Sequence, residues 1–107
     1  MSRRVVVRPL AKEDLDEQAR YIAQDSVAAA LRFLDAAESA FDRLNSMNEI
    51  GRRRAFLHPE LAQVRSWPIP GFEKHVIFYR VAEGVVDVLR VLEAARDLER
   101  IFGPEDR

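Results

Sequence analysis

The chain has 107 residues, a common size for a single domain, and its 48% hydrophobic and 33% charged residues are typical of a folded protein. It has no cysteine, which excludes disulfide bonds, thiolate metal sites and cysteine nucleophiles. The formal net charge of −1 lacks the basic excess of a nucleic-acid-binding protein, and no apolar run is long enough for a signal peptide or membrane span. We therefore expect one cytoplasmic domain over 1–107, without sequence-specific nucleic-acid binding.

The first half predicts a short strand and two helices. The valines at 5–7 favour a strand from Arg3 to Arg8, and Pro9 suits the first turn of a helix. Apolar residues then recur at helical spacing, at Ala11, Leu15, Ala19 and Ile22. Asp25-Ser26 breaks this pattern and supplies an N-cap for a second helix. The apolar stripe of that helix is predicted at Val27, Ala30, Leu31, Leu34, Ala37, Phe41 and Leu44. So short a break predicts an antiparallel helical hairpin.

The second half predicts a loop, three strands and a helix. Residues 45–61 contain polar residues, a glycine and a triple arginine, which favours a loop with at most a short turn of helix. Alternating residues predict strands at 62–69, 75–81 and 85–92, the last two joined at Glu83-Gly84. A two-residue turn there would place Tyr79 opposite Val88 and Phe78 opposite Leu89.

The order of these elements predicts an α+β fold. The chain would run strand, helix, helix, three strands and a short C-terminal helix over 94–102. The helical hairpin would pack on one face of a mostly antiparallel sheet, as in a two-layer α+β sandwich.

No residue cluster predicts a metal site or a cofactor, and the two histidines are far apart in sequence. We expect His58 in a loop and His75 half-exposed on a strand. Arginine and aromatic residues on the C-terminal strands are the remaining candidates for chemistry. Arg65, His75, Tyr79 and Arg90 together would suffice to hold a phosphate and move a proton in metal-free RNA cleavage.

A structural role for these residues is the favoured interpretation. Strand arginines are commonly solvated or ion-paired, and Tyr79 and Trp67 would pack at the edge of the core. The triple arginine Arg52, Arg53 and Arg54 would lie in a solvated loop, with contact to an acidic partner as the alternative.

Eight short motifs, in order along nearly the whole chain, resemble the ParE toxins of the RelE/ParE superfamily, the toxic half of type II toxin–antitoxin modules. They are Ala11-x-x-Asp14-Leu15, Tyr21-Ile22, Ala30-x-x-Phe33, Ile50-Gly51-Arg52, Arg65-x-Trp67-x-Ile69-x-Gly71-Phe72, Phe78-Tyr79-Arg80-Val81, Val88-Leu89-Arg90-Val91-Leu92 and Ala95-Arg96-Asp97-Leu98.

The resemblance implies a toxin that poisons DNA gyrase by binding it, without being an enzyme and without a cofactor. It also implies a ParD-like antitoxin whose C-terminal segment wraps the toxin and neutralises it. We expect an antitoxin helix along the apolar, alanine-rich hairpin and an extended segment at the sheet edge. Residues for antitoxin or target contact would be the following: Arg52, Arg53, Arg54, Arg65, Trp67, Tyr79, Arg90 and Arg96.

One departure from the family pattern bears on the alternatives. Members usually carry His-Gly before the Ala-Arg-Asp ending, whereas this chain has Glu93-Ala94. A glutamate repels phosphate at neutral pH, which weakens the alternative of a RelE-like ribosome-dependent mRNA endoribonuclease. A further alternative is a toxin that has lost its poison and persists as a binding module.

Overall fold

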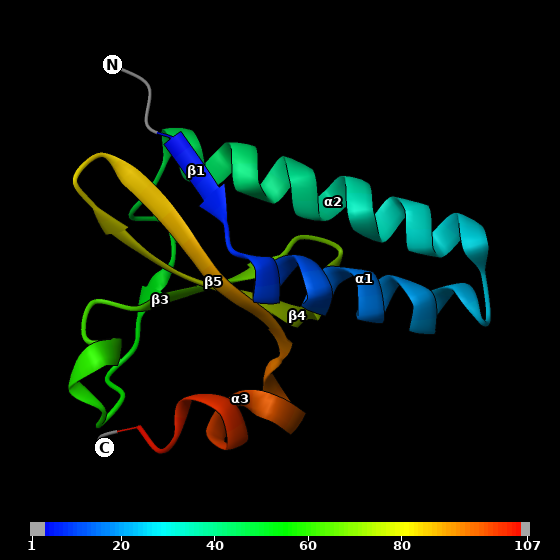
Figure 1. Cartoon of the computed structure of the whole chain (residues 1–107). Helices are drawn as coiled ribbons and strands as arrows, with labels where there is room; N and C mark the ends of the chain where they lie inside the picture. Colours follow the sequence, from blue (N-terminus) through cyan, green and yellow to red (C-terminus); the bar gives the residue numbers. More distant parts are fainter. Residues whose placement is uncertain (1–3, 106–107) are drawn as a thin grey trace.

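The structure is a computed structural model that describes residues 4–105 (Figure 1). Arg3, the first residue predicted for the first strand, lies outside the described residues. The elements are β1 (Arg4–Val7), α1 (Pro9–Ala23), α2 (Val27–Ser46), β2 (Arg52–Arg53), the 3-10 turn η1 (Pro59–Leu61), β3 (Arg65–Ile69), β4 (Phe72–Ala82), β5 (Val85–Glu93) and α3 (Ala94–Phe102).

The five strands form one mixed sheet in the order β1-β5-β4-β3-β2. β1 pairs with β5 in parallel, and the other neighbours are antiparallel. The predicted α+β class and the order of its elements are confirmed. The predicted loop over 45–61 is wrong at Arg52–Arg53, which pair with Ser66 and Arg65 as an edge strand.

Helices α1 and α2 form the predicted hairpin and lie across one face of the sheet (Figure 1). The buried stripe of α2 differs from the predicted one, because Val27 and Leu31 are 64% and 58% exposed whereas Phe33 is fully buried. The stripe runs through Ala30, Phe33, Ala37, Ala40 and Leu44, with Leu34 and Phe41 partly buried beside it. Two apolar stripes therefore share this helix, and one of them faces outward.

Ser26 caps α2 as predicted, since its Oγ accepts a hydrogen bond of 3.1 Å from the Ala29 N–H. We expect Ser26→Ala to lower the free energy of unfolding by about 1 kcal/mol, because one N–H of the first turn loses its partner. Urea unfolding followed by circular dichroism measures this loss. Ser39→Ala, an exposed substitution within the same helix, is the matched control and should cost nothing. Equal losses in both variants would contradict a capping role.

The predicted register between β4 and β5 is right near the turn and wrong beyond it. Tyr79 pairs with Val88 as predicted, but Phe78 pairs with Arg90 instead of Leu89. Leu89 is thus the extra residue of a β-bulge, and every pair beyond it shifts by one position.

The two faces of the sheet are covered by different parts of the chain. Ile77 and Tyr79 point to the hairpin, where they pack with Phe33 and Leu44. On the opposite face, Val76 and Phe78 pack with residues from other segments: Phe56, Val64, Leu92 and Phe102. Helix α3 therefore lies on the face away from the hairpin, as Figure 1 also shows.

Candidate functional site

Tyr79 is held inside the molecule by the segment that follows α2. Its side chain is fully buried, its hydroxyl donates to the Asn48 carbonyl at 2.8 Å, and it accepts from the Gly51 N–H at 2.8 Å. Arg65, its cross-strand partner, donates to the Gly51 carbonyl at 2.8 Å and to the Glu49 carbonyl at 3.3 Å. Burial raises the pKa of Tyr79. The hydroxyl is thus neutral at physiological pH, with both hydrogen bonds directed to the backbone.

Arg90 is engaged by the first helix. Its guanidinium makes two bonds of 2.8 Å to the Asp14 carboxylate, and these bonds raise the pKa of Arg90. The same carboxylate accepts from the Val91 N–H at 3.0 Å. β1 pairs with β5 only as far as Val88, so within residues 4–105 the Val91 N–H has no strand partner on that side. The Asp14 carboxylate takes the place of that partner.

His75 is only 3% exposed, so the prediction of a half-exposed strand residue is wrong. Its ring packs on Phe33, with centroids 4.7 Å apart, and its Nδ1 lies 2.7 Å from the Gln18 Oε1. The Gln18 side-chain amide donates to the Val91 carbonyl at 2.8 Å. Burial lowers the pKa of His75; Glu93 opposes this effect, while nearby cations reinforce it.

We expect the free energy of unfolding to decrease as the pH is lowered, because of His75. An unfolded histidine has a pKa of 6.5 and takes up a proton more readily than the folded one, so the free energy of unfolding is highest above pH 6.5 and decreases as the pH falls through the lower folded value. Urea unfolding at a series of pH values measures the slope. Three carboxylates with lowered pKa, Asp87, Asp97 and Glu105, act in the same direction but below their ordinary values of 3.8 for the aspartates and 4.5 for the glutamate.

The control for that slope is the second histidine. His75→Phe should remove most of the decrease between pH 7 and about pH 5, whereas His58→Phe, at an exposed position, should keep it. If the free energy of unfolding of His75→Phe still decreases over this pH range, the decrease is not caused by His75.

The three consecutive arginines have different environments. Arg52 and Arg53 are exposed on the edge strand β2, and Arg53 donates to Gln63 at 3.1 Å. Arg54 turns inward, where it pairs with the Glu105 carboxylate and donates to the Ser66 hydroxyl at 3.1 Å. Its side chain is 11% exposed. Arg54 thus ties Glu105 to the sheet, and within residues 4–105 the two arginines of the three without an ion pair are those on β2.

The other predicted contact residues range from half-buried to exposed. Trp67 lies opposite Ile77 and packs partly buried against the hairpin side of the core. Arg96, on α3, is 67% exposed and binds Asp97 through bonds of 3.0 and 2.9 Å. Bonds to Arg96 lower the pKa of Asp97.

The residues proposed for RNA cleavage therefore make separate internal contacts. Arg65 and Tyr79 bind the segment 48–51, whereas His75 and Arg90 bind side chains one turn apart on α1. Gln18 was not predicted as the partner of His75. Its only signal was a polar residue three positions after Leu15, which a solvated helix face explains equally well.

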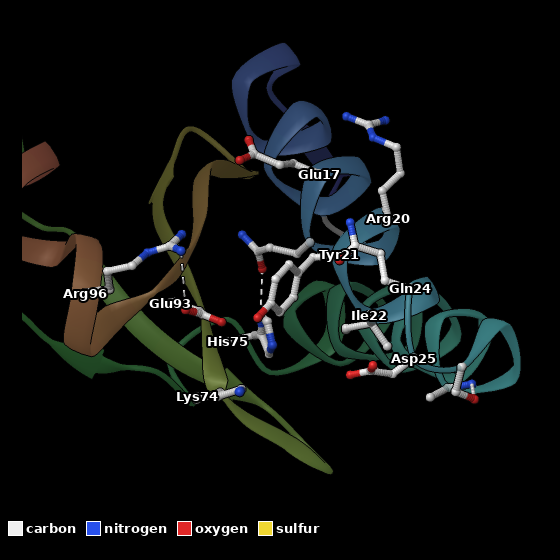
Figure 2. Close-up of a pocket in the computed structure, with 13 residues that line it drawn as sticks. Glu17, Arg20, Tyr21, Ile22, Gln24, Asp25, Lys74, His75, Glu93 and Arg96 are labelled. Atoms are coloured by element: carbon white, nitrogen blue, oxygen red, sulfur yellow. Dashed lines mark hydrogen bonds and ion pairs between the residues drawn. The ribbon is translucent and has the colours of Figure 1, made fainter.

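A pocket of about 760 Å³ lies between the end of α1, the start of α2, the first residues of β4 and the junction of β5 with α3 (Figure 2). Its lining residues are Glu17, Gln18, Arg20, Tyr21, Ile22, Gln24, Asp25, Ser26, Ala29, Lys74, His75, Glu93 and Arg96. Three of these are acidic and three are basic. His75 is thus the buried polar group of a pocket whose walls carry no excess charge.

Large apolar side chains are also exposed on the hairpin. They are Leu10 and Tyr21 on α1, and Val27 and Leu31 on α2, with exposures between 54% and 68%. Within residues 4–105, no helix is both long and apolar enough to cross a bilayer. The same part of the chain holds no group of three or more histidine, aspartate or glutamate side chains placed to bind a metal ion.

Comparison with known proteins gives one family. A family model described as "ParE toxin of type II toxin-antitoxin system, parDE" matches residues 5–98. A search of curated proteins finds no significant match. A chain in a solved structure described as "Chromosomal ParDE TA system from P. aeruginosa" is 20% identical, with a TM-score of 0.61 over 83% of this chain and 92% of that chain. That likeness shows the fold, and the family model, which covers most of the sequence, shows that the chain belongs to the ParE toxins of type II toxin–antitoxin systems.

Proposed function

We propose that this ParE toxin arrests bacterial growth by binding and poisoning DNA gyrase, and that a ParD-like antitoxin neutralises it. The proposal rests on family membership together with one observation, the fully buried Tyr79 hydroxyl with both hydrogen bonds made to the backbone. A group in that state has no free donor or acceptor for a substrate. Its environment supports inhibition by binding over chemistry on RNA.

The alternative, a RelE-like mRNA endoribonuclease, would need Arg65, His75, Tyr79 and Arg90 to act on one phosphodiester. Each has an internal partner instead, and the Arg90–Asp14 pair cancels the charge that would hold phosphate. Glu93 adds a carboxylate beside His75. These contacts argue against ribonuclease chemistry and support inhibition by binding, and gyrase is proposed as the target from family membership.

Purified protein provides the test. At an excess of toxin over gyrase, supercoiling should stop and cleavage complexes should accumulate, and addition of the antitoxin should restore supercoiling. Normal supercoiling at toxin excess would rule gyrase out. RNA sequencing during growth arrest tests the alternative directly, because transcripts cut on ribosomes would indicate a ribonuclease.

Antitoxin binding is proposed at the outward stripe of the hairpin. Val27 and Leu31 lie one turn apart on α2, and Leu10 and Tyr21 expose apolar surface on α1. An amphipathic antitoxin helix would cover this surface, since apolar anchors at helical spacing are the usual contact in such complexes. The proposal predicts that polar substitutions here weaken the complex while the toxin stays folded.

An extended, acidic antitoxin segment is proposed along β2. Arg52 and Arg53 are exposed on that edge of the sheet, where backbone groups can pair with an added strand. We expect the double variant Arg52→Glu, Arg53→Glu to weaken antitoxin binding by about a hundredfold, because two attractions become repulsions. Isothermal titration calorimetry measures this change. Arg4→Glu, an exposed charge reversal at the opposite edge, should leave the affinity unchanged.

A further inference from the structure

The pocket of Figure 2 contains a hydrogen-bond acceptor on His75, because the neighbouring groups determine which of its ring nitrogens carries the proton. The Val91 carbonyl can only accept, so the amide nitrogen of Gln18 must face it. The Oε1 of Gln18 therefore faces His75, and the proton between them must be on Nδ1 of the imidazole. In a neutral ring the other nitrogen, Nε2, then carries a lone pair.

Nε2 has no hydrogen-bond partner within residues 4–105. His75 is nevertheless 97% buried, since its exposed fraction is 3%, and it lines the pocket between Tyr21 and Glu93 (Figure 2). Among the described residues, the side-chain polar atom that is both shielded from solvent and without a partner is Asn45 Oδ1, so Nε2 keeps access to water through the pocket. A ligand that covers Nε2 must donate a hydrogen bond to it, because otherwise the bond to water is lost without a replacement. The pocket thus favours an occupant with a donor at its buried end.

The other lining residues indicate the polarity and size of the group that would fill the pocket. The walls include apolar surface from Ile22, Ala29 and the Tyr21 ring, which is 68% exposed. The basic and acidic side chains are equal in number, and Arg96 is already paired with Asp97. A charged group gains no net attraction, so a neutral occupant with an apolar body fits best. The volume of about 760 Å³ accommodates a large side chain.

We propose that this pocket binds a tryptophan side chain of a protein partner, with the indole N–H donating to Nε2 of His75. Indole combines a large apolar body with a single N–H donor, which matches a pocket that offers Nε2 as an acceptor, whereas the Glu93 carboxylate is paired with Arg96 at 3.8 Å. Aromatic anchors in pockets commonly supply much of the free energy of an interface. The proposal rests on the proposed function only in that the protein acts by binding other proteins.

Two small probes test the pocket without gyrase or antitoxin. N-acetyl-tryptophanamide and its 1-methylindole analogue differ only in whether the indole nitrogen carries a hydrogen or a methyl group. Each is titrated into the isotope-labelled full chain while NMR follows the Gln18 amide and the His75 ring nitrogens. We expect the methylated probe to bind about tenfold more weakly, because Nε2 stays unpaired. Equal affinities, shifts confined to other residues, or no binding at millimolar concentration would overturn the proposal.

Variants separate the acceptor from the residue that positions it. His75→Phe keeps a ring against Phe33 and should abolish the preference between the probes. Gln18→Met frees the tautomer and should reduce the preference, and acidification that protonates His75 should remove it in the native protein. Glu38→Gln, about 14 Å beyond Ala29 along α2, is the control and should keep the preference. A preference that survives His75→Phe would also overturn the proposal.

Discussion

Replacing Gly51 by alanine is expected to lower the free energy of unfolding by about 3 kcal/mol, through overpacking and the loss of two buried hydrogen bonds. A Cβ at this position would lie 2.5 Å from the Tyr79 hydroxyl oxygen and 2.7 Å from a ring carbon. Tyr79 is fully buried and cannot swing aside without giving up the Asn48 carbonyl and the Gly51 N–H. Urea unfolding of the purified variant measures the loss.

A double-variant cycle separates the steric effect from the loss of hydrogen bonds. Tyr79→Phe removes the nearest of the atoms that the new methyl group would meet, together with its two hydrogen bonds, and leaves the ring carbons at 2.7 and 2.9 Å. We therefore expect Gly51→Ala and Tyr79→Phe together to cost less than the sum of the two single variants. Strictly additive losses would show that the methyl group clashes elsewhere. A reduced toxicity of Tyr79→Phe would be explained by its loss of stability alone. The presence of intact transcripts during growth arrest is therefore the better test of catalysis.

Replacing Asp14 by alanine is expected to cost about 3 kcal/mol, at the lower end for breaking a buried ion pair because the Arg90 side chain is still 22% exposed. The variant leaves Arg90 without its two charge-assisted bonds and the Val91 N–H without an acceptor. Thermal and urea unfolding measure the change. The largest local effect should be faster hydrogen exchange at Val91, since its N–H opens to water.

Two substitutions identify the origin of that loss. Asp14→Asn keeps an oxygen for the Val91 N–H and should cost less than Asp14→Ala. Adding Arg90→Leu to Asp14→Ala should recover part of the stability, because no uncompensated charge remains. If Arg90→Leu instead adds its own full cost, the ion pair is not what Asp14→Ala disrupts.

The element order was predictable because each helix or strand has a strong local pattern. The bounds of α3 and the cap at Ser26 follow from such patterns and are confirmed. The register of β5 was not predictable, because a bulge at Leu89 depends on packing against both faces of the sheet. A period of two cannot reveal an extra residue in one strand.

The outward face of α2 shows a second limit of sequence reasoning. Leu31 and Phe33 both fit a helical apolar stripe, and the choice between the stripes depends on what the sheet presents. His75 packs on Phe33, and that contact accounts for the burial that was not expected.

The candidate site was the least predictable part. Arg54 directly follows Arg52 and Arg53 in the sequence, yet its role depends on Glu105, far along the chain. Likewise, nothing local links Gln18 to His75, which are 57 residues apart. Contacts of this kind depend on the topology of the fold, and local sequence patterns do not predict them.

The parallel pairing of β1 with β5 has a consequence for synthesis of the toxin in the cell. Arg8 meets Asp87 across 79 residues of chain, so β1 has no strand partner until β5 has been translated. Until β5 emerges from the ribosome, the hairpin lacks the strand that its first helix covers, and long-range pairing of this kind closes late. The surface that the hairpin and the sheet form together is therefore incomplete until β5 has been synthesised.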